Sequence, residues 1–190
     1  MLDAHCMTRP RPLPETAREP SYRVGELREM GAGRKRLHAR DMNRVAHGVV
    51  LNPAVCLDLT DVHDRCLAFS PALQEQHFYS RRTSAQLWGM PVSGVPGDLL
   101  EVGSPHPSRA PRREGVSAHR IRPGTVETPQ LRGVRLAAPE DTWCLLAAVV
   151  GLDELIIAGD YVLSGARVVG GAGRRVPALC TPESLAAAVH

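Results

Sequence analysis

Apolar residues occur along this chain in short clusters, and Gly, Pro or charged residues separate each cluster from the next. Helical spacing and helix-start signals predict helices within residues 21–30, 34–40, 56–76, 80–89, 139–150, 152–163 and 181–190. Alternation of apolar and polar residues predicts strands at 45–51, 98–103, 116–121 and 131–136, and the pair at 78–79 is also typical of a strand. Short strands with turns between them favour a mixed or antiparallel sheet. The predicted fold class is therefore α/β in the sense of α+β.

Local signals also indicate where helices begin and which residues they bury. Ser80 or Thr83 can cap the helix that ends before Gly89. Pro139 and Thr181 occupy starting positions that are typical of Pro and Thr. The residues expected to face the core are Leu59, Val62, Cys66 and Leu67 within 56–76, and Leu152, Leu155, Ile156 and Tyr161 in the helix at 152–163.

The stretch from Ser21 to Val50 has the pattern of two helices joined by a glycine turn and followed by a strand. Gly31 and Gly33 permit the positive φ angles that a sharp turn between helices needs. The second helix is basic and has one clearly apolar residue, Leu37. This pattern suits the DNA-reading helix of a winged helix-turn-helix, with residues 45–51 as a strand of the wing. A charged helix on the surface of an ordinary domain is the alternative.

Helical geometry assigns roles to the basic side chains. Residues four positions apart share a helix face, so Arg36 and Arg40 should lie together. Leu37 should point the other way, toward Leu27 and the core. The start of a recognition helix meets bases and phosphates. The candidate DNA-binding residues are Arg34, Lys35, Arg36, Arg40 and Arg44.

The distribution of charge supports the same interpretation. The chain has 23 Lys and Arg against 20 Asp and Glu, which gives a net charge of +3. Residues 1–48 hold 10 basic and 6 acidic residues, whereas the remainder holds 13 basic and 14 acidic residues. The positive excess therefore lies around the candidate DNA reader, as phosphate contact requires.

Composition excludes several classes of protein. No apolar run reaches the ~18 residues of a transmembrane helix, and the N-terminus lacks the apolar region of a secretory signal. Five scattered cysteines favour a reduced, cytoplasmic protein. Prolines at the N-terminus and the Asn52-Pro53 break indicate the boundaries. We predict a disordered or loosely docked arm at 1–20, a winged helix-turn-helix at 21–51, and an α/β domain at 55–190 that ends in a helix.

Catalytic chemistry is not indicated by the residue pattern. Cys56, His63 and Cys66 offer zinc ligands, but their spacing matches no usual finger and no fourth ligand is evident. Cysteines buried on a helix are the preferred interpretation. His63 and His119 are isolated in the sequence, and no pair of acids has metal-ligand character. No catalytic residue, metal or cofactor is therefore predicted.

Two further segments have unusual composition. Arg109, Arg112 and Arg113 form a second basic patch in a loop rich in Pro and Arg, which we interpret as a solvated hairpin tip. Val168–Arg175 contains three glycines but no following Lys-Ser/Thr, so it is a flexible connection in preference to a phosphate loop.

Four segments together resemble the AbiEi-type antitoxin family, and more closely its actinobacterial relatives that carry a very-short-patch-repair-like endonuclease domain. They occur in the order of the family and cover most of residues 21–163. The segments are YRVGELREMGAGRKRLHARDMNRVAHGVVL, FYSRRTSAQLWGMPV, the strand pair around EVGSP and GVSAHRI, and GVRLAAPEDTWCLLAAVVGLDELIIAGDYVL.

This resemblance implies a function. The family has an N-terminal winged helix that binds DNA, represses its own operon, and precedes an α/β domain without known catalytic residues. The resemblance implies double-stranded DNA as a partner and a cognate nucleotidyltransferase-like toxin as a second partner. No membrane partner is expected, because the chain has no apolar run of transmembrane length. The chain departs from the family at Leu145, where an acid is frequent, and at Arg81, where His is common.

The endonuclease domain of the closest relatives would begin after the helix near Thr181, so we expect its chemistry to have no counterpart here. The favoured hypothesis is a DNA-binding, non-enzymatic transcriptional regulator of the antitoxin type. Two alternatives stay open. One is the remnant of an endonuclease protein that has lost its nuclease domain, and the other is a protein–protein interaction module.

Overall fold

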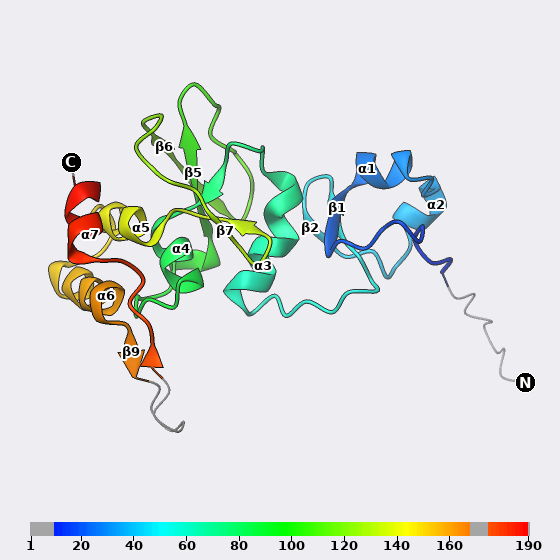
Figure 1. Cartoon of the computed structure of the whole chain (residues 1–190). Helices are drawn as coiled ribbons and strands as arrows, with labels where there is room; N and C mark the ends of the chain where they lie inside the picture. The colour runs from blue at the N-terminus through cyan, green and yellow to red at the C-terminus, as the bar shows by residue number, and fades with distance from the viewer. Residues whose placement is uncertain (1–9, 168–174, 190) are drawn as a thin grey trace, which may run out of the picture.

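The computed structural model describes residues 10–167 and 175–189. Helices account for 34% of the residues and strands for 17%, so the α/β fold class is confirmed. Figure 1 shows the first elements of the chain at one end of the molecule and the last helices at the other, with α3 (Val62–Phe69) between them. The predicted connection at Val168–Arg175 lies outside the described residues, apart from Arg175.

The N-terminal elements form a small sheet with two short helices. The chain order is β1 (Ser21–Arg23), α1 (Val24–Glu29), α2 (Arg34–Leu37), β2 (Arg44–Ala46) and β3 (Val49–Leu51). The three strands are antiparallel in the order β1-β3-β2. Residues 45–51 were expected as one strand, but they contribute to two, because Gly48 adopts a φ of 76° and turns the chain.

A separate apolar cluster holds these elements together. Leu27 and Leu37 are buried from the two helices, and Val50 is buried from the middle strand. Leu37 therefore points toward Leu27, as the sequence predicts. Met30 is 39% exposed, so the apolar face of α1 ends at Leu27.

The described part of the N-terminal arm packs against this cluster. Leu13 and Ala17 contact it, and the buried Asn52 side chain donates hydrogen bonds to the carbonyl oxygens of Ala17 and Glu19 at 3.0 and 3.1 Å. Within residues 10–20 the arm is therefore docked by specific contacts, which corresponds to the docked alternative of the prediction and not to disorder. Residues 1–9 lie outside the described part of the chain.

A second sheet forms the centre of the molecule. β4 (Phe78–Tyr79) pairs antiparallel with β5 (Leu100–Pro105), and β5 pairs parallel with β6 (Val116–Ile121) from Leu100↔Val116 onward. The expected mixed sheet is confirmed. The predicted strand at 131–136 is instead a tight hairpin of β7 (Gln130–Leu131) and β8 (Val134–Arg135).

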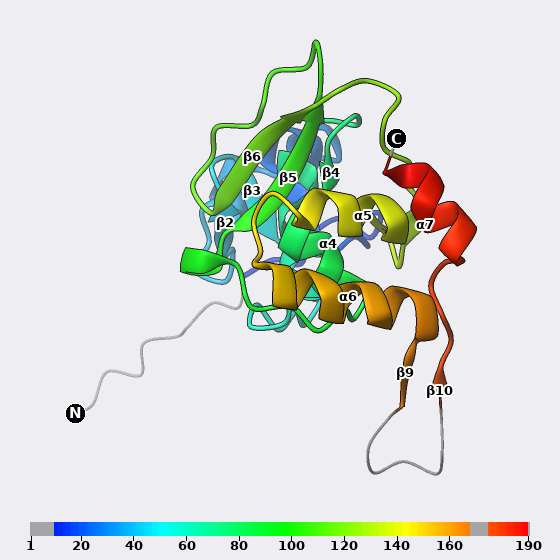
Figure 2. The same ribbon diagram turned by 90° about the vertical axis from the view of Figure 1, so that its left-hand side faces the viewer.

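Four helices pack at the C-terminal end, as Figure 2 shows. They are α4 (Arg81–Leu87), α5 (Pro139–Leu146), α6 (Leu152–Ser164) and α7 (Pro182–Ala188). The Thr181 side chain caps α7, as predicted. Ser80 occupies the N-cap position of α4, but its side chain makes no capping hydrogen bond, so the predicted cap is wrong in that respect. The helix predicted at 139–150 is shorter and ends at Leu146. Two 3₁₀ turns, Ser70–Ala72 and Pro96–Asp98, and the strand pair β9 (Ala166–Arg167) and β10 (Arg175–Val176) complete the fold.

The predicted buried face of α6 is right for Leu155 and Tyr161, which pack against an apolar cluster, but wrong for Leu152 and Ile156. Leu152 and Ile156 are 72% and 52% exposed, whereas Ala158, Gly159 and Val162 are buried. A Cβ atom at Gly159 would lie 2.9 Å from Nε1 of Trp143 on α5. The helix therefore packs through its small residues, because these admit the Trp143 ring. In the same way Leu59, predicted to face the core, is 41% exposed and precedes α3.

Hydrogen bonds join the N-terminal sheet to α3 and the turn after it. The Ser21 hydroxyl donates to the carbonyl of Leu67 at 3.0 Å. The Arg23 guanidinium donates to the carbonyls of Pro71 and Leu73. These contacts fix the N-terminal sheet against the central part of the molecule, and they determine which surfaces of the two parts face each other.

Candidate nucleic-acid interface

The glycine turn sets the position of the basic segment. Gly31 has a φ of 94°, a conformation that favours glycine. Ala32 then turns inward, where it is 7% exposed and its N–H donates to the carbonyl of Leu27 at 2.8 Å. Gly33 is the N-cap residue of α2, and Leu37 is the buried residue of this helix. The chain thereby holds α2 by Leu37 and leaves its other side chains outside the core.

The five candidate DNA-binding residues have different environments. Arg34, Lys35, Arg40 and Arg44 are exposed, whereas Arg36 is largely covered. Arg34 and Lys35 lie at the start of α2, and Arg44 lies on β2. Four of the five side chains are thus accessible to a polyanion.

The expected helix face is wrong for Arg40. The prediction placed Arg36 and Arg40 on one helical turn, but α2 is only four residues long and ends at Leu37. His38 has φ −107° and ψ 7°, which is not helical, and the chain turns there so that Met42 enters the core. Arg40 therefore lies in the turn that follows the helix.

Arg36 is engaged within the protein. Its side chain is 9% exposed, and its two terminal nitrogens donate to the two carboxylate oxygens of Asp41 at 2.7 and 2.8 Å. This bidentate geometry is the strongest form of an arginine–carboxylate contact. Arg36 consequently stabilises the turn after α2, and its guanidinium is not presented to solvent in the way the sequence suggested.

The N-terminal arm adds to the basic surface. Residues 10–14 lie across a depression of about 710 Å³ from the segment 31–39, with Arg11 on one side and Lys35 on the other. Arg11 is exposed. The arm therefore runs beside α2, where its charge can contribute to the same surface.

A third group of basic residues, after those of the α2–β2 segment and the N-terminal arm, comes from a distant part of the sequence. Nη1 of Arg113 donates to the carbonyl of His47 at 3.0 Å, which ties the loop between β5 and β6 to the β2–β3 hairpin. Arg44 then shares a cleft with Arg109 and Arg112. The loop interpreted from sequence as a solvated hairpin tip is thus docked on the hairpin, a contact that local patterns do not reveal.

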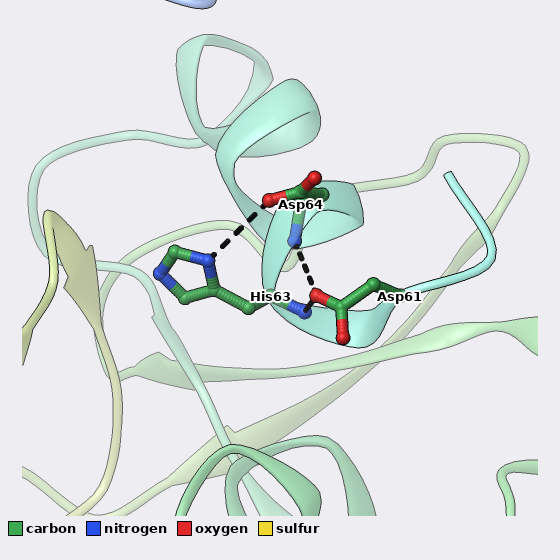
Figure 3. Close-up of side chains that lie close together, drawn as sticks. All are labelled: Asp61, His63 and Asp64. Atoms are coloured by element: carbon green, nitrogen blue, oxygen red, sulfur yellow. Dashed lines mark hydrogen bonds and ion pairs between the residues drawn. The ribbon is translucent and has the colours of Figure 1, made fainter. Parts of the chain in front are cut away.

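A different group of side chains has the composition of a metal site. Asp61, His63 and Asp64 offer ligand atoms within 4.8 Å of one another. Figure 3 shows these three side chains at the start of α3. The Asp61 carboxylate accepts from the N–H groups of His63 and Asp64 at 2.9 and 3.1 Å, so it caps α3. Nδ1 of His63 lies 3.6 Å from the Asp64 carboxylate, and its Nε2 lies 3.2 Å from the carbonyl of Arg132. Helix capping accounts for this arrangement.

The cysteines considered as zinc ligands are not brought together with His63 in that group. Cys66 is fully buried on α3, and burial raises the pKa of its thiol. Cys56 is exposed. Cys66 thus matches the preferred interpretation of a core cysteine.

Sequence reasoning missed a cluster at the start of α4. The Ser80 hydroxyl lies 3.4 Å from Nε2 of His119 on β6. Burial and the neighbouring Arg81 lower the pKa of His119 to about 4, so its ring is neutral near pH 7. Ser80 is completely buried, which keeps its hydroxyl from solvent.

A buried carboxylate completes this cluster. Glu101 is 5% exposed and accepts from the N–H of Arg82 at 2.9 Å, while its own N–H donates to the Thr83 hydroxyl at 2.8 Å. The residues therefore join the first turn of α4 to β5. The sequence signal that could have indicated this cluster is the predicted strand-to-helix junction at Ser80. In the structure, Arg81 at this junction has a φ of 50°.

No protein-family model matches this chain, and no curated protein matches it either. None of the helices in the described part of the chain has both the length and the apolar composition needed to cross a bilayer.

Proposed function

We propose that this protein is a DNA-binding regulator whose N-terminal elements act as a winged helix-turn-helix. The single observation that carries the proposal is the arrangement of α2, which is anchored by the buried Leu37 and carries the exposed side chains of Arg34 and Lys35. The antiparallel β2–β3 hairpin follows it directly, with Arg44 exposed on β2. Exposed cations on a short helix beside such a hairpin suit contact with the phosphates of duplex DNA.

The contact residues of the proposal are Arg34, Lys35, Arg40 and Arg44. Arg36 is left out because Asp41 occupies its guanidinium. Removal of a side chain that contacts guanine through two hydrogen bonds should weaken binding by ~1–3 kcal/mol and relax specificity at one base. Removal of a phosphate contact should instead weaken binding to every sequence and reduce the salt slope by about one unit.

The test is a binding titration at two salt concentrations on duplex DNA taken from upstream of the gene. It compares the parent protein with the separate variants Arg34→Ala, Lys35→Ala, Arg40→Ala and Arg44→Ala. Arg122→Ala is the matched control, because it removes one exposed arginine from the loop after β6. Unchanged affinity in all four variants, with folding intact, would refute the proposal and favour the protein–protein interaction module.

The regulatory role proposed for this DNA binding is that of an antitoxin. It rests on the family resemblance of the four sequence segments, which also proposes a nucleotidyltransferase-like toxin as the second partner. A toxin reading frame beside the gene supports this role. A downstream, out-of-frame nuclease segment would instead support a remnant of an endonuclease protein.

We also infer that the chain does not cleave DNA. The group at Asp61, His63 and Asp64 is the arrangement most similar to a metal site among the described residues, and its capping of α3 accounts for it. Purified protein incubated with supercoiled plasmid and Mg²⁺ or Mn²⁺ should leave the plasmid intact. Cleavage that survives repurification and disappears in an Asp64→Asn variant would contradict this inference.

A further inference from the structure

A cleft of about 960 Å³ lies between the β2–β3 hairpin and the loop that joins β5 to β6. Arg44 and His47 form one wall, and Arg109, Arg112 and Arg113 form the other. The hydrogen bond from Arg113 to the carbonyl of His47 joins the two walls. The cleft is therefore assembled from segments about sixty residues apart in the sequence, which only the folded chain brings together.

The cleft carries a strong positive charge. Four guanidinium groups line it, and Glu114 is the one acidic residue among the lining residues. Within residues 10–167 and 175–189, none of these four arginines lies within 4.0 Å of a carboxylate. Cations that line one cleft without anionic partners repel one another, so a bound anion would stabilise this arrangement.

A buried hydrogen-bond donor also lines the cleft. His77 is 5% exposed, and its Nδ1 accepts from the N–H of Gln74 at 3.2 Å. Burial lowers the pKa of His77, so the ring is neutral near pH 7 and its proton resides on Nε2. Nε2 is buried and has no hydrogen-bond partner among the described residues.

Apolar side chains line the remaining surface. Phe69, Val45 and Pro111 face the cleft. The Phe69 ring lies against Gly115, where an added Cβ atom would be 3.0 Å from its Cζ atom. Phe69 lines the same cleft as the arginines, and an aromatic ring is a surface on which a flat, weakly polar group can stack.

We propose that this cleft binds a small phosphate-bearing molecule with a flat apolar group, of the class of nucleotides. The arginines bind the phosphates by charge-assisted hydrogen bonds, and the Phe69 side receives the flat group. The volume lies in the range of small-molecule sites, which are ~300–1,000 Å³. The site goes beyond the proposed DNA surface, although Arg44 belongs to both.

Calorimetric titration of the full chain tests this assignment, with ATP and pyrophosphate as the probes. ATP should bind saturably, and excess pyrophosphate should displace it, because both use the arginines. The double variant Arg109→Ala, Arg112→Ala should bind ATP at least about tenfold more weakly, as expected for the loss of charge-assisted contacts. Arg113 is left intact because it holds the loop on the hairpin.

Controls separate this site from the DNA surface and from general charge. Arg122→Ala should bind ATP as the parent does, and so should Arg34→Ala, whose side chain belongs only to the proposed DNA reader. Equal weakening in Arg122→Ala, unchanged ATP affinity in the double variant, or no saturable binding of either probe at millimolar concentration would overturn the assignment. A further combination of results would also overturn the assignment: the parent protein binds no ATP, and the double variant loses binding to duplex DNA. The cleft would then belong to the DNA surface.

Discussion

Arg36 and Asp41 face each other across the turn that follows α2, and two parallel hydrogen bonds of 2.7 and 2.8 Å join them. The Arg36 side chain is 9% exposed and that of Asp41 is 35% exposed, so water screens the pair only in part. This turn carries Arg40 and precedes β2. The pair therefore supports the position of the exposed cations without being one of them.

Arg36→Ala should lower the free energy of unfolding by about 1–3 kcal/mol, because it removes charge-assisted hydrogen bonds and leaves Asp41 unpaired. Asp41→Ala should have an effect of similar size. The double variant should cost less than the sum of the two single variants, since the pair is lost only once. Urea denaturation of the four proteins measures this coupling, and strictly additive losses would show that the two side chains act independently.

Close packing at Gly103 gives a second prediction. A Cβ atom there would lie 2.6 Å from Cζ of Phe78, its register partner on β4. Gly103→Ala should therefore destabilise the protein by about 1–3 kcal/mol as the ring is forced aside. Gly25→Ala is the matched control, because no atom lies within 4 Å of an added Cβ on α1. Replacement there should stabilise by ~0.5–1 kcal/mol, and thermal unfolding that ranks the two variants in the opposite order would contradict the packing argument.

The pKa of His119 predicts a loss of stability in acid. It is about 4 in the folded protein, lowered by burial and by Arg81 from the ordinary value of 6.5. The unfolded chain therefore binds more protons than the folded chain between these two values. The stability contributed by the neutral ring is complete above pH 6.5 and is lost as pH falls toward 4.

Urea denaturation at several pH values across this window tests the assignment. The free energy of unfolding should fall less steeply with acid in His119→Gln than in the parent protein. His38→Gln removes an exposed histidine and serves as the control. His77, whose pKa is also lowered by burial, is present in all three proteins, so its contribution cancels in the comparison. Identical pH profiles for the parent and His119→Gln would exclude this role.

Local signals in the sequence predicted local structure well. The Thr181 side chain caps α7 as expected, because capping depends on residues within one helical turn. The strand predicted at 116–121 coincides with β6 for the same reason: its alternation is visible without its partners. Leu37 was assigned to the core correctly, since it is the apolar residue of a basic helix.

Long-range contacts explain the predictions that failed. The buried face predicted for α6 was assigned from its large apolar residues. The helix instead packs through Gly159, because Trp143 of α5 fills the space beside it. Arg36 was grouped with the other cations because no periodic pattern reveals its pairing with Asp41. The cleft between residues 44–47 and 109–115 depends on how two sheets are placed, which composition and spacing do not encode locally.

Asn52 holds the N-terminal arm, and its amide gives the last prediction. The residue is 2% exposed, and its Nδ2 donates to the carbonyls of Ala17 and Glu19. Its Oδ1 accepts from the N–H of Ala54 at 3.0 Å. Asn52→Asp keeps the size and the acceptor but turns a carboxylate oxygen toward two carbonyl oxygens. This variant should lose about 1–3 kcal/mol of stability near neutral pH, because two partly buried acceptors lose their donor and face a negative charge.

Protonation of the new carboxyl distinguishes this mechanism from a general packing defect. A carboxyl group among carbonyl acceptors has its pKa raised, and its protonated form regains one donor, so acidification should restore part of the lost stability. Asn43→Asp is the matched control, since it introduces the same charge at an exposed position. Limited proteolysis should cut the arm of Asn52→Asp faster than that of the control. Equal rates, together with a loss of stability that does not depend on pH, would mean that Asn52 does not hold the arm.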